Sequence, residues 1–171
     1  MPDTRRLDVI KKIQTKLKEI KAPDYPCDLA DNVFIGRLVT GEETDLPFIT
    51  LWEPFSEDGP DVASKVEHRS ARAGRDAVNA SHTVKIRYYL QGFVSSPSVK
   101  SDIPTEQAYM LLGCIDQCLG PELEKPKAFG ANSIEMGAGL VRPANTMDAK
   151  NPYCLVTLDI TLTEERGKPY V

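Results

Sequence analysis

The stretch from His82 to Val94, HTVKIRYYLQGFV, limits the fold of this chain more than any other part of the sequence. Its side chains alternate strictly, and the apolar positions on one face are Val84, Ile86, Tyr88 and Leu90. A period of two over this length, rich in β-branched and aromatic residues, predicts a long strand with one buried face. A second stretch near the C-terminus repeats the pattern, with inward positions Cys154, Val156, Leu158, Ile160 and Leu162. The two strands are expected to pair in one sheet.

A first helix is predicted near the N-terminus, where Asp3 or Thr4 can cap it and Pro23 and Pro26 follow it. Its apolar positions recur every three or four residues, at Leu7, Ile10, Ile13, Leu17 and Ile20. Lysines occupy the other side, at positions 11, 12, 16 and 18. We interpret this basic side as a solvated face rather than as a membrane or nucleic-acid surface.

A second helix is predicted between the two long strands. It follows Asp102, has Pro104 in its first turn and ends at Gly120 and Pro121. Its apolar positions are Ala108, Leu111, Leu112, Ile115 and Leu119. Because each helix has one apolar stripe and each long strand one apolar face, both helices are expected on the same face of the sheet.

Shorter segments complete the predicted fold. Residues Asn32 to Val39 and Leu46 to Trp52 are interpreted as a strand hairpin, and Leu140 to Pro143 as a short edge strand. The segments from Glu53 to Ser81 and from Pro121 to Gly139 are predicted to be long loops, the second closing with glycines in tight turns. The sequence therefore predicts a single α+β domain over residues 1–171, with a mixed or antiparallel sheet of about four to five strands.

Composition narrows the functional classes. The 171 residues are 41% hydrophobic and 27% charged, which suits one globular domain. A net charge of -4 argues against a dedicated nucleic-acid binder, although a local basic loop is still compatible with it. The N-terminal residues have no uninterrupted apolar run, so neither a secretory signal nor a membrane span is expected.

No motif for catalysis or cofactor binding stands out. The four cysteines, at positions 27, 114, 118 and 154, form no CxxC pair, and the two histidines lack zinc-finger spacing from them. We interpret the four cysteines as reduced, structural thiols in a cytosolic setting. The sequence contains no GxSxG, HExxH, GxGxxG or GxxxxGK motif. We therefore expect no enzyme activity, cofactor or metal, although a nuclease that holds metal with carboxylates alone remains an alternative.

Four stretches make the chain resemble the tail-terminator proteins of long-tailed bacteriophages. They are RRLDVIKKIQTKLKEI at 5–20, LPFITLWE at 46–53, HTVKIRYYLQGFV at 82–94 and CLVTLDITLTEE at 154–165. The predicted order of a helix, a hairpin, a long loop, a long strand, a helix and a long strand is similar to that family. The long middle and late loops depart from its compact members, which leaves open the surface that these loops cover.

The resemblance implies a structural virion protein at the head-proximal end of the tail. Such a subunit closes as a homohexameric ring on the last tail-tube ring, stops tube growth and forms the surface that joins the head. The implied partners are further copies of the chain, the major tail tube protein, the head connector or neck protein and the tape measure protein. Genomic DNA would pass through the ring without specific binding, and the subunit would be in the host cytoplasm before assembly.

Two groups of residues are candidates for roles in such a ring. Because cations bind DNA phosphates and slow their release, a channel for DNA is expected to be acidic or neutral. We assign Glu42, Glu43, Asp45 and Glu53 to the lumen, with solvated acidic turns as the plain alternative. The second group is Arg69, Arg72 and Arg75, which we assign to contact with a protein neighbour, with a flexible solvated loop as the plain alternative. The alternatives for the whole chain are another phage neck or tail-tube component and a small nucleic-acid-binding module that uses these arginines.

Overall fold

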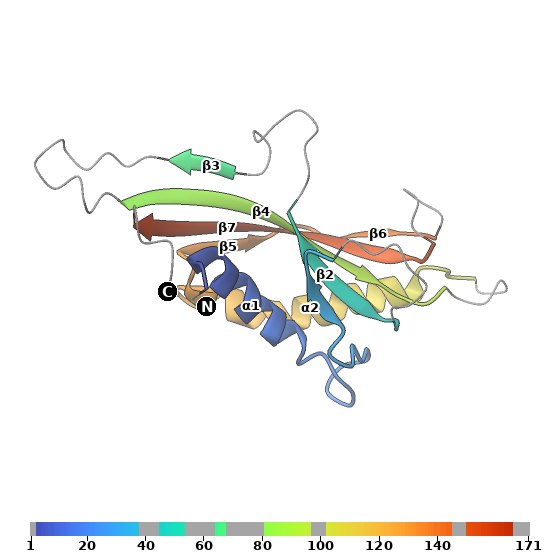
Figure 1. Ribbon diagram of the computed structural model, residues 1–171. Coiled ribbons are helices and arrows are strands. Elements are labelled where there is room, and N and C mark those ends of the chain that lie inside the picture. The colour runs from blue at the N-terminus through green and yellow to red at the C-terminus, as the bar shows by residue number, and fades with distance from the viewer. Residues whose placement is uncertain are drawn as a thin grey trace, which may run out of the picture.

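The computed structural model describes residues 3–37, 45–53, 64–67, 81–96, 102–144 and 150–165. Figure 1 shows one open sheet with both long helices beneath it, so the predicted α+β fold is confirmed. In chain order the elements are α1 (Arg5–Leu17), β1 (Val33–Ile35), β2 (Phe48–Trp52), β3 (Ser64–Glu67), β4 (Ser81–Phe93), α2 (Glu106–Leu123), the 3-10 helix η3 (Ala128–Gly130), β5 (Ser133–Met136), β6 (Leu140–Arg142) and β7 (Tyr153–Glu165). Within these ranges no helix is long and apolar enough to cross a membrane.

The two long strands β4 and β7 form the centre of the sheet. They pair antiparallel along their whole length, from Ser81 opposite Glu165 to Phe93 opposite Tyr153. The strand order is β1-β2-β4-β7-β5, with β3 also paired to β4 and β6 also paired to β7. The pairing of the two alternating stretches is therefore confirmed.

In the described ranges the sheet has seven strands rather than the four to five expected, because each central strand is flanked by two short ones in succession. β2 pairs with β4 up to Trp52 opposite Tyr89, and β3 resumes along the same side with Ser64 opposite Ile86. The segment predicted as one loop from Glu53 to Ser81 thus contains a strand. In the same way, the predicted loop from Pro121 to Gly139 contains the last residues of α2 and the whole of η3 and β5.

The predicted hairpin at residues 32–52 is wrong. β1 and β2 pair parallel, with Val33 opposite Ile49 and Ile35 opposite Leu51. Parallel neighbours require a long crossover rather than a tight turn, and residues 36–47 are long enough to supply it. The turn-forming residues at 41–45 gave the signal for a hairpin, and a pattern of two strands and a turn does not fix strand direction.

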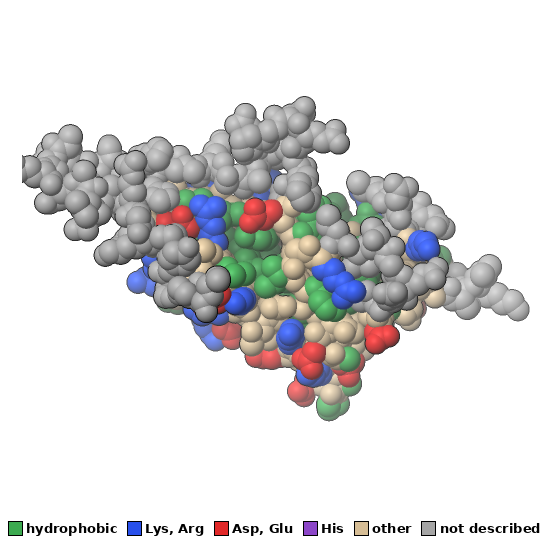
Figure 2. Space-filling view, in the orientation of Figure 1, with side chains coloured by type: hydrophobic (Ala, Val, Ile, Leu, Met, Phe, Trp, Pro, Cys, Tyr) green, Lys and Arg blue, Asp and Glu red, His purple; other side chains and the backbone are tan. Residues whose placement is uncertain are grey.

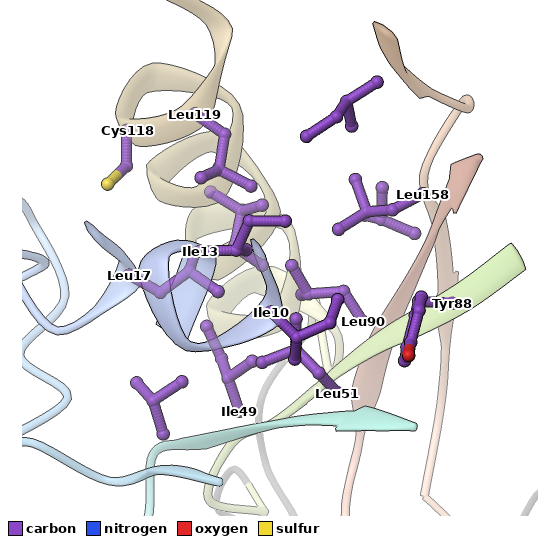
Figure 3. Close-up of a cluster of buried hydrophobic side chains, with 14 of the residues drawn as sticks. Ile10, Ile13, Leu17, Ile49, Leu51, Tyr88, Leu90, Cys118, Leu119 and Leu158 are labelled. Atoms are coloured by element: carbon purple, nitrogen blue, oxygen red, sulfur yellow. The ribbon is translucent and has the colours of Figure 1, made fainter. Parts of the chain in front are cut away.

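The core lies between the helices and the sheet. Figure 3 shows side chains of α1, including Ile10, Ile13 and Leu17, directed into the space that α2 and the strands also fill. Every inward position predicted on β4 and β7 is buried, and so are the predicted positions of α1 after Leu7. Leu7 is the exception, with 37% of its surface exposed.

The helix ends follow the sequence signals in part. Thr4 caps α1, and its Oγ1 accepts a hydrogen bond from the Leu7 amide at 3.3 Å. α2 begins after Thr105, so Pro104 precedes the helix instead of lying in its first turn. α2 also continues through Pro121 to Leu123, because a proline in the last turn removes only one hydrogen bond from a helix already held by its packing. The predicted edge strand at residues 140–143 is confirmed as β6.

Candidate interaction surfaces

The sheet face that points away from both helices carries a row of aromatic side chains across four strands. Phe48 lies 4.9 Å from Phe93 and 6.2 Å from Phe34 between ring centroids, and Phe93 lies 5.6 Å from Tyr153. The Arg37 guanidinium lies over the Phe34 ring at 4.5 Å. Such aromatic contacts add stability beyond the burial of their area, so the row forms an ordered apolar patch.

The alternating pattern itself produces this row. The helix-facing positions of β4 are the even-numbered ones, so Phe93 falls on the opposite face. The pairing then places Phe48 and Tyr153 on either side of Phe93. The sequence alone did not predict this patch. Which residues become neighbours across two strands depends on the register of strand pairing, and a sequence does not specify that register. Of the described elements, both long helices cover only the other face (Figure 1).

The same face carries an ion pair near the middle of the long strands. Arg87 and Asp159 are opposite each other, with Nε to Oδ1 at 2.6 Å and Nη2 to Oδ2 at 2.7 Å. The hydrogen bonds from Arg87 lower the pKa of Asp159 below its ordinary value of 3.8. Because both side chains are more than 40% exposed, this pair contributes little to stability and mainly orders the surface.

The pair gives a testable pH dependence. Since the folded pKa of Asp159 is lowered, its contribution is present above about pH 4 and is lost as the pH falls through the folded pKa. We expect Arg87→Gln to raise the pKa of Asp159 towards 3.8, measured by NMR titration of the side-chain carboxyl. Lys85→Gln serves as the control, because it removes a cation from the same strand face. We expect it to cause no comparable rise in the pKa of Asp159. An equal pKa in wild type and Arg87→Gln would contradict the assignment.

A hollow of about 610 Å³ lies between the start of α1 and the end of β2. Its apolar lining includes Leu7, Ile10, Ile35 and Leu51. In Figure 2 hydrophobic side chains gather in the middle of this side of the molecule, between α1 and β2, with charged side chains around them. The hollow lies beyond the end of β1, which pairs with β2 only as far as Leu51.

Polar side chains surround this hollow. Arg6 donates two hydrogen bonds to Glu164, at 2.8 and 3.2 Å, and Glu164 is buried at 9% exposure. The hydrogen bond to Glu164 raises the pKa of Arg6. The Tyr88 hydroxyl donates to Glu53 at 2.6 Å, and burial first, then this hydrogen bond, raises the pKa of Tyr88. These bonds fasten α1 and the end of β2 to the central strands.

A second hollow, of about 490 Å³, lies at the opposite edge of the sheet between α2 and the connection of β5 with β6. Its lining includes Tyr109, Leu112, Asp116 and Met136. On α2, Tyr109 is 60% exposed and Met110 is 41% exposed, which is unusual for large apolar side chains.

A β-bulge shapes this second hollow. Met136 is opposite Leu158 and Leu140 is opposite Leu155, so residues 137–139 face only two residues of β7. A Cβ atom at Gly139 would lie 2.3 Å from Leu112 Cδ1, and one at Gly137 would lie 2.1 Å from Thr157 Oγ1. The prediction that Gly137 and Gly139 form tight turns is therefore corrected. Both positions need glycine because the bulged edge lies too close to α2 and β7 for a side chain.

The residues assigned to the lumen are not brought together by the described part of the structure. Asp45 is exposed before β2, whereas Glu53 lies just after β2 and accepts the Tyr88 hydrogen bond. Glu42 and Glu43 lie outside the described residues, and so do Arg69, Arg72 and Arg75. The assignments to lumen and contact loop stay predictions.

The cysteines lie in the core or beside it. Cys114, Cys118 and Cys154 are buried, and Cys27 is half-buried. Burial raises the pKa of Cys27 and of Cys154 to about 12, which keeps these thiols protonated and unreactive. Within the described ranges, no three His, Cys, Asp or Glu side chains are grouped so that they could hold a metal ion.

The basic side of α1 is exposed and largely ion-paired. Lys11 pairs with Asp3 at 2.7 Å and Lys12 with Asp8 at 2.6 Å, and Lys16 pairs with Glu122 of α2 at 3.7 Å. These are surface pairs, which contribute little to stability.

No known protein family matches this sequence, and no curated protein matches it.

Proposed function

We propose that this chain is a structural subunit of a bacteriophage tail that closes as a homohexameric ring on the head-proximal end of the tail tube. In this role it terminates tube polymerisation and offers the surface to which the head connector or neck protein binds. The tape measure protein would end near the ring, and genomic DNA would pass through it. The resemblance of the four stretches and the α+β fold support this proposal.

The observation that carries the proposal is the aromatic row on the sheet face away from the helices. Phe34, Phe48, Phe93 and Tyr153 form one apolar patch across β1, β2, β4 and β7. Phe48 and Tyr153 are buried, at 2% and 4% exposure, whereas Phe34 and Phe93 are partly exposed and offer apolar area that another protein can cover. A tail subunit needs several such surfaces, since it contacts its neighbours, the tube and the neck at the same time.

The test is the assembly state of the purified chain. We expect mass photometry to detect a six-copy ring, either alone or after mixing with tubes of the tail tube protein, and negative-stain images to place it at one tube end. Added during tube polymerisation, the chain should shorten the tubes. A chain that stays monomeric and leaves tube length unchanged would contradict the proposal, and a salt-sensitive mobility shift of duplex DNA would favour the nucleic-acid alternative.

A further inference from the structure

The two helices differ strongly in charge. Residues 3–21, which contain α1, have seven Lys and Arg residues against three acids. Residues 102–124, which contain α2, have five acids and no Lys or Arg. One helix therefore carries an excess of positive charge and the other only negative charge.

The helices pack against each other beneath the sheet, and Lys16 of α1 forms an ion pair with Glu122 of α2 at 3.7 Å. Beyond this shared contact, α1 lies towards β1, whereas α2 lies along β4, β7, β6 and β5, and both helices contact η3. The strand order places β1 at one end of the sheet and β5 at the other, and α1 lies in front of α2 in Figure 1. A subunit of a ring must present two different surfaces to its two neighbours, because a head-to-tail contact joins unlike patches. The outer sides of α1 and α2 are two such surfaces.

The outer side of α1 is exposed and basic. Lys11 and Lys12 project there, with side chains about half exposed at 49% and 51%. Leu7 lies one turn before Lys11 and is 37% exposed, so one large apolar side chain accompanies the charges. Next to it is the hollow between α1 and β2, which Leu7 also lines. Figure 2 shows Lys and Arg side chains gathered over α1.

The outer side of α2 has the complementary character. Glu106, Tyr109, Met110, Gly113 and Asp116 are all exposed and recur at helical spacing on one side of the helix. Among the residues that the structure describes, none forms an ion pair with Asp116 or Glu106. Tyr109 and Asp116 both line the hollow beside the bulge. This surface combines two carboxylates with two large apolar anchors.

The geometry points to a contact between copies of this chain in which the basic outer side of α1 on one copy binds the acidic outer side of α2 on the next. This inference rests on the proposed function, because it names the contact that joins the subunits of the ring. Met110 and Tyr109 supply the apolar centre of the contact and the charges surround it, as in other interfaces. Charge complementarity also fixes which helix surface meets which, since two α1 surfaces or two α2 surfaces repel each other.

Charge reversal tests the contact. Variant A combines Lys11→Glu with Lys12→Glu, and variant B combines Glu106→Lys with Asp116→Lys. Each places like charges at every junction, and we expect the protein concentration for half-assembly to rise about tenfold or more. The four substitutions together restore opposite charges, so the combined variant should assemble again. Asp24→Lys, an exposed reversal in the segment between α1 and β1, is the control and should assemble as wild type does.

Salt provides an independent measurement on the wild-type protein. Raising the ionic strength from about 0.1 M to about 1 M shortens the Debye length from about 10 Å to about 3 Å, so half-assembly should need more protein. Circular dichroism and thermal melting of each variant verify that it is folded. Rings that survive in variants A and B, or a combined variant that fails to assemble although it is folded, would overturn this contact and leave the proposed function standing. A wild-type chain that forms no ring, with or without tubes, overturns both.

Discussion

Replacing Leu158 by Ala is expected to lower the free energy of unfolding by about 2–5 kcal/mol. Leu158 is fully buried near the middle of β7, opposite Tyr88 on β4 and Met136 on β5. The substitution removes three carbons from the close-packed space between the sheet and the helices, and a rigid sheet centre cannot collapse to fill the cavity. Chemical denaturation measures the effect as a shift of the midpoint at unchanged slope.

Lys85→Ala is the matched control for this experiment, because Lys85 is exposed on the other face of β4. We expect it to change the free energy of unfolding by no more than about 0.5 kcal/mol. A denaturation midpoint that is the same for Leu158→Ala and wild type would show that the core is not where the strand pattern and the packing place it.

Replacing Gly92 by Ala is expected to lower the free energy of unfolding by about 1–3 kcal/mol. Gly92 lies on the helix-facing side of β4, where a Cβ atom would be 2.7 Å from Leu111 Cδ2 and 3.0 Å from Cys154 Sγ. Both neighbours are fully buried, so neither side chain can move aside without disturbing the core. The cost therefore arises from overpacking between α2 and the two central strands.

The same change at Gly113 should have the opposite sign. A Cβ atom there meets no atom within 4 Å, and Gly113 lies inside α2 on its exposed side. Alanine favours a helix over glycine by about 0.8–1.0 kcal/mol, so Gly113→Ala should stabilise the monomer by up to about 1 kcal/mol. Thermal melting of both variants under one condition separates packing from backbone propensity. A similar shift for both variants would contradict the overpacking at Gly92.

Local sequence patterns correctly predicted the strands and helices that have one buried face and one exposed face. The alternation at 82–94 and 153–165 placed the central strands, and the apolar stripes placed α1 and α2 on one side of them. These predictions hold because the side-chain period of a strand or helix is a property of the local backbone, and each element must bury its apolar side. The N-terminal cap at Thr4 is local in the same sense, since the hydroxyl and the amide that it binds are three residues apart.

Tertiary structure alone decided the contacts that connect distant parts of the chain. The parallel direction of β1 beside β2, the one-residue bulge between β5 and β6, and the bond from Arg6 to Glu164 all depend on which strands become neighbours. The aromatic row depends on it too, because its members are adjacent only in the register of four paired strands. Strand order and register follow from the packing of the whole core, whereas a single sequence states only which residues favour burial. The sequence therefore determined the layers of this protein and the charges of its helices, and only the tertiary structure decided that the two helices pack side by side beneath the sheet.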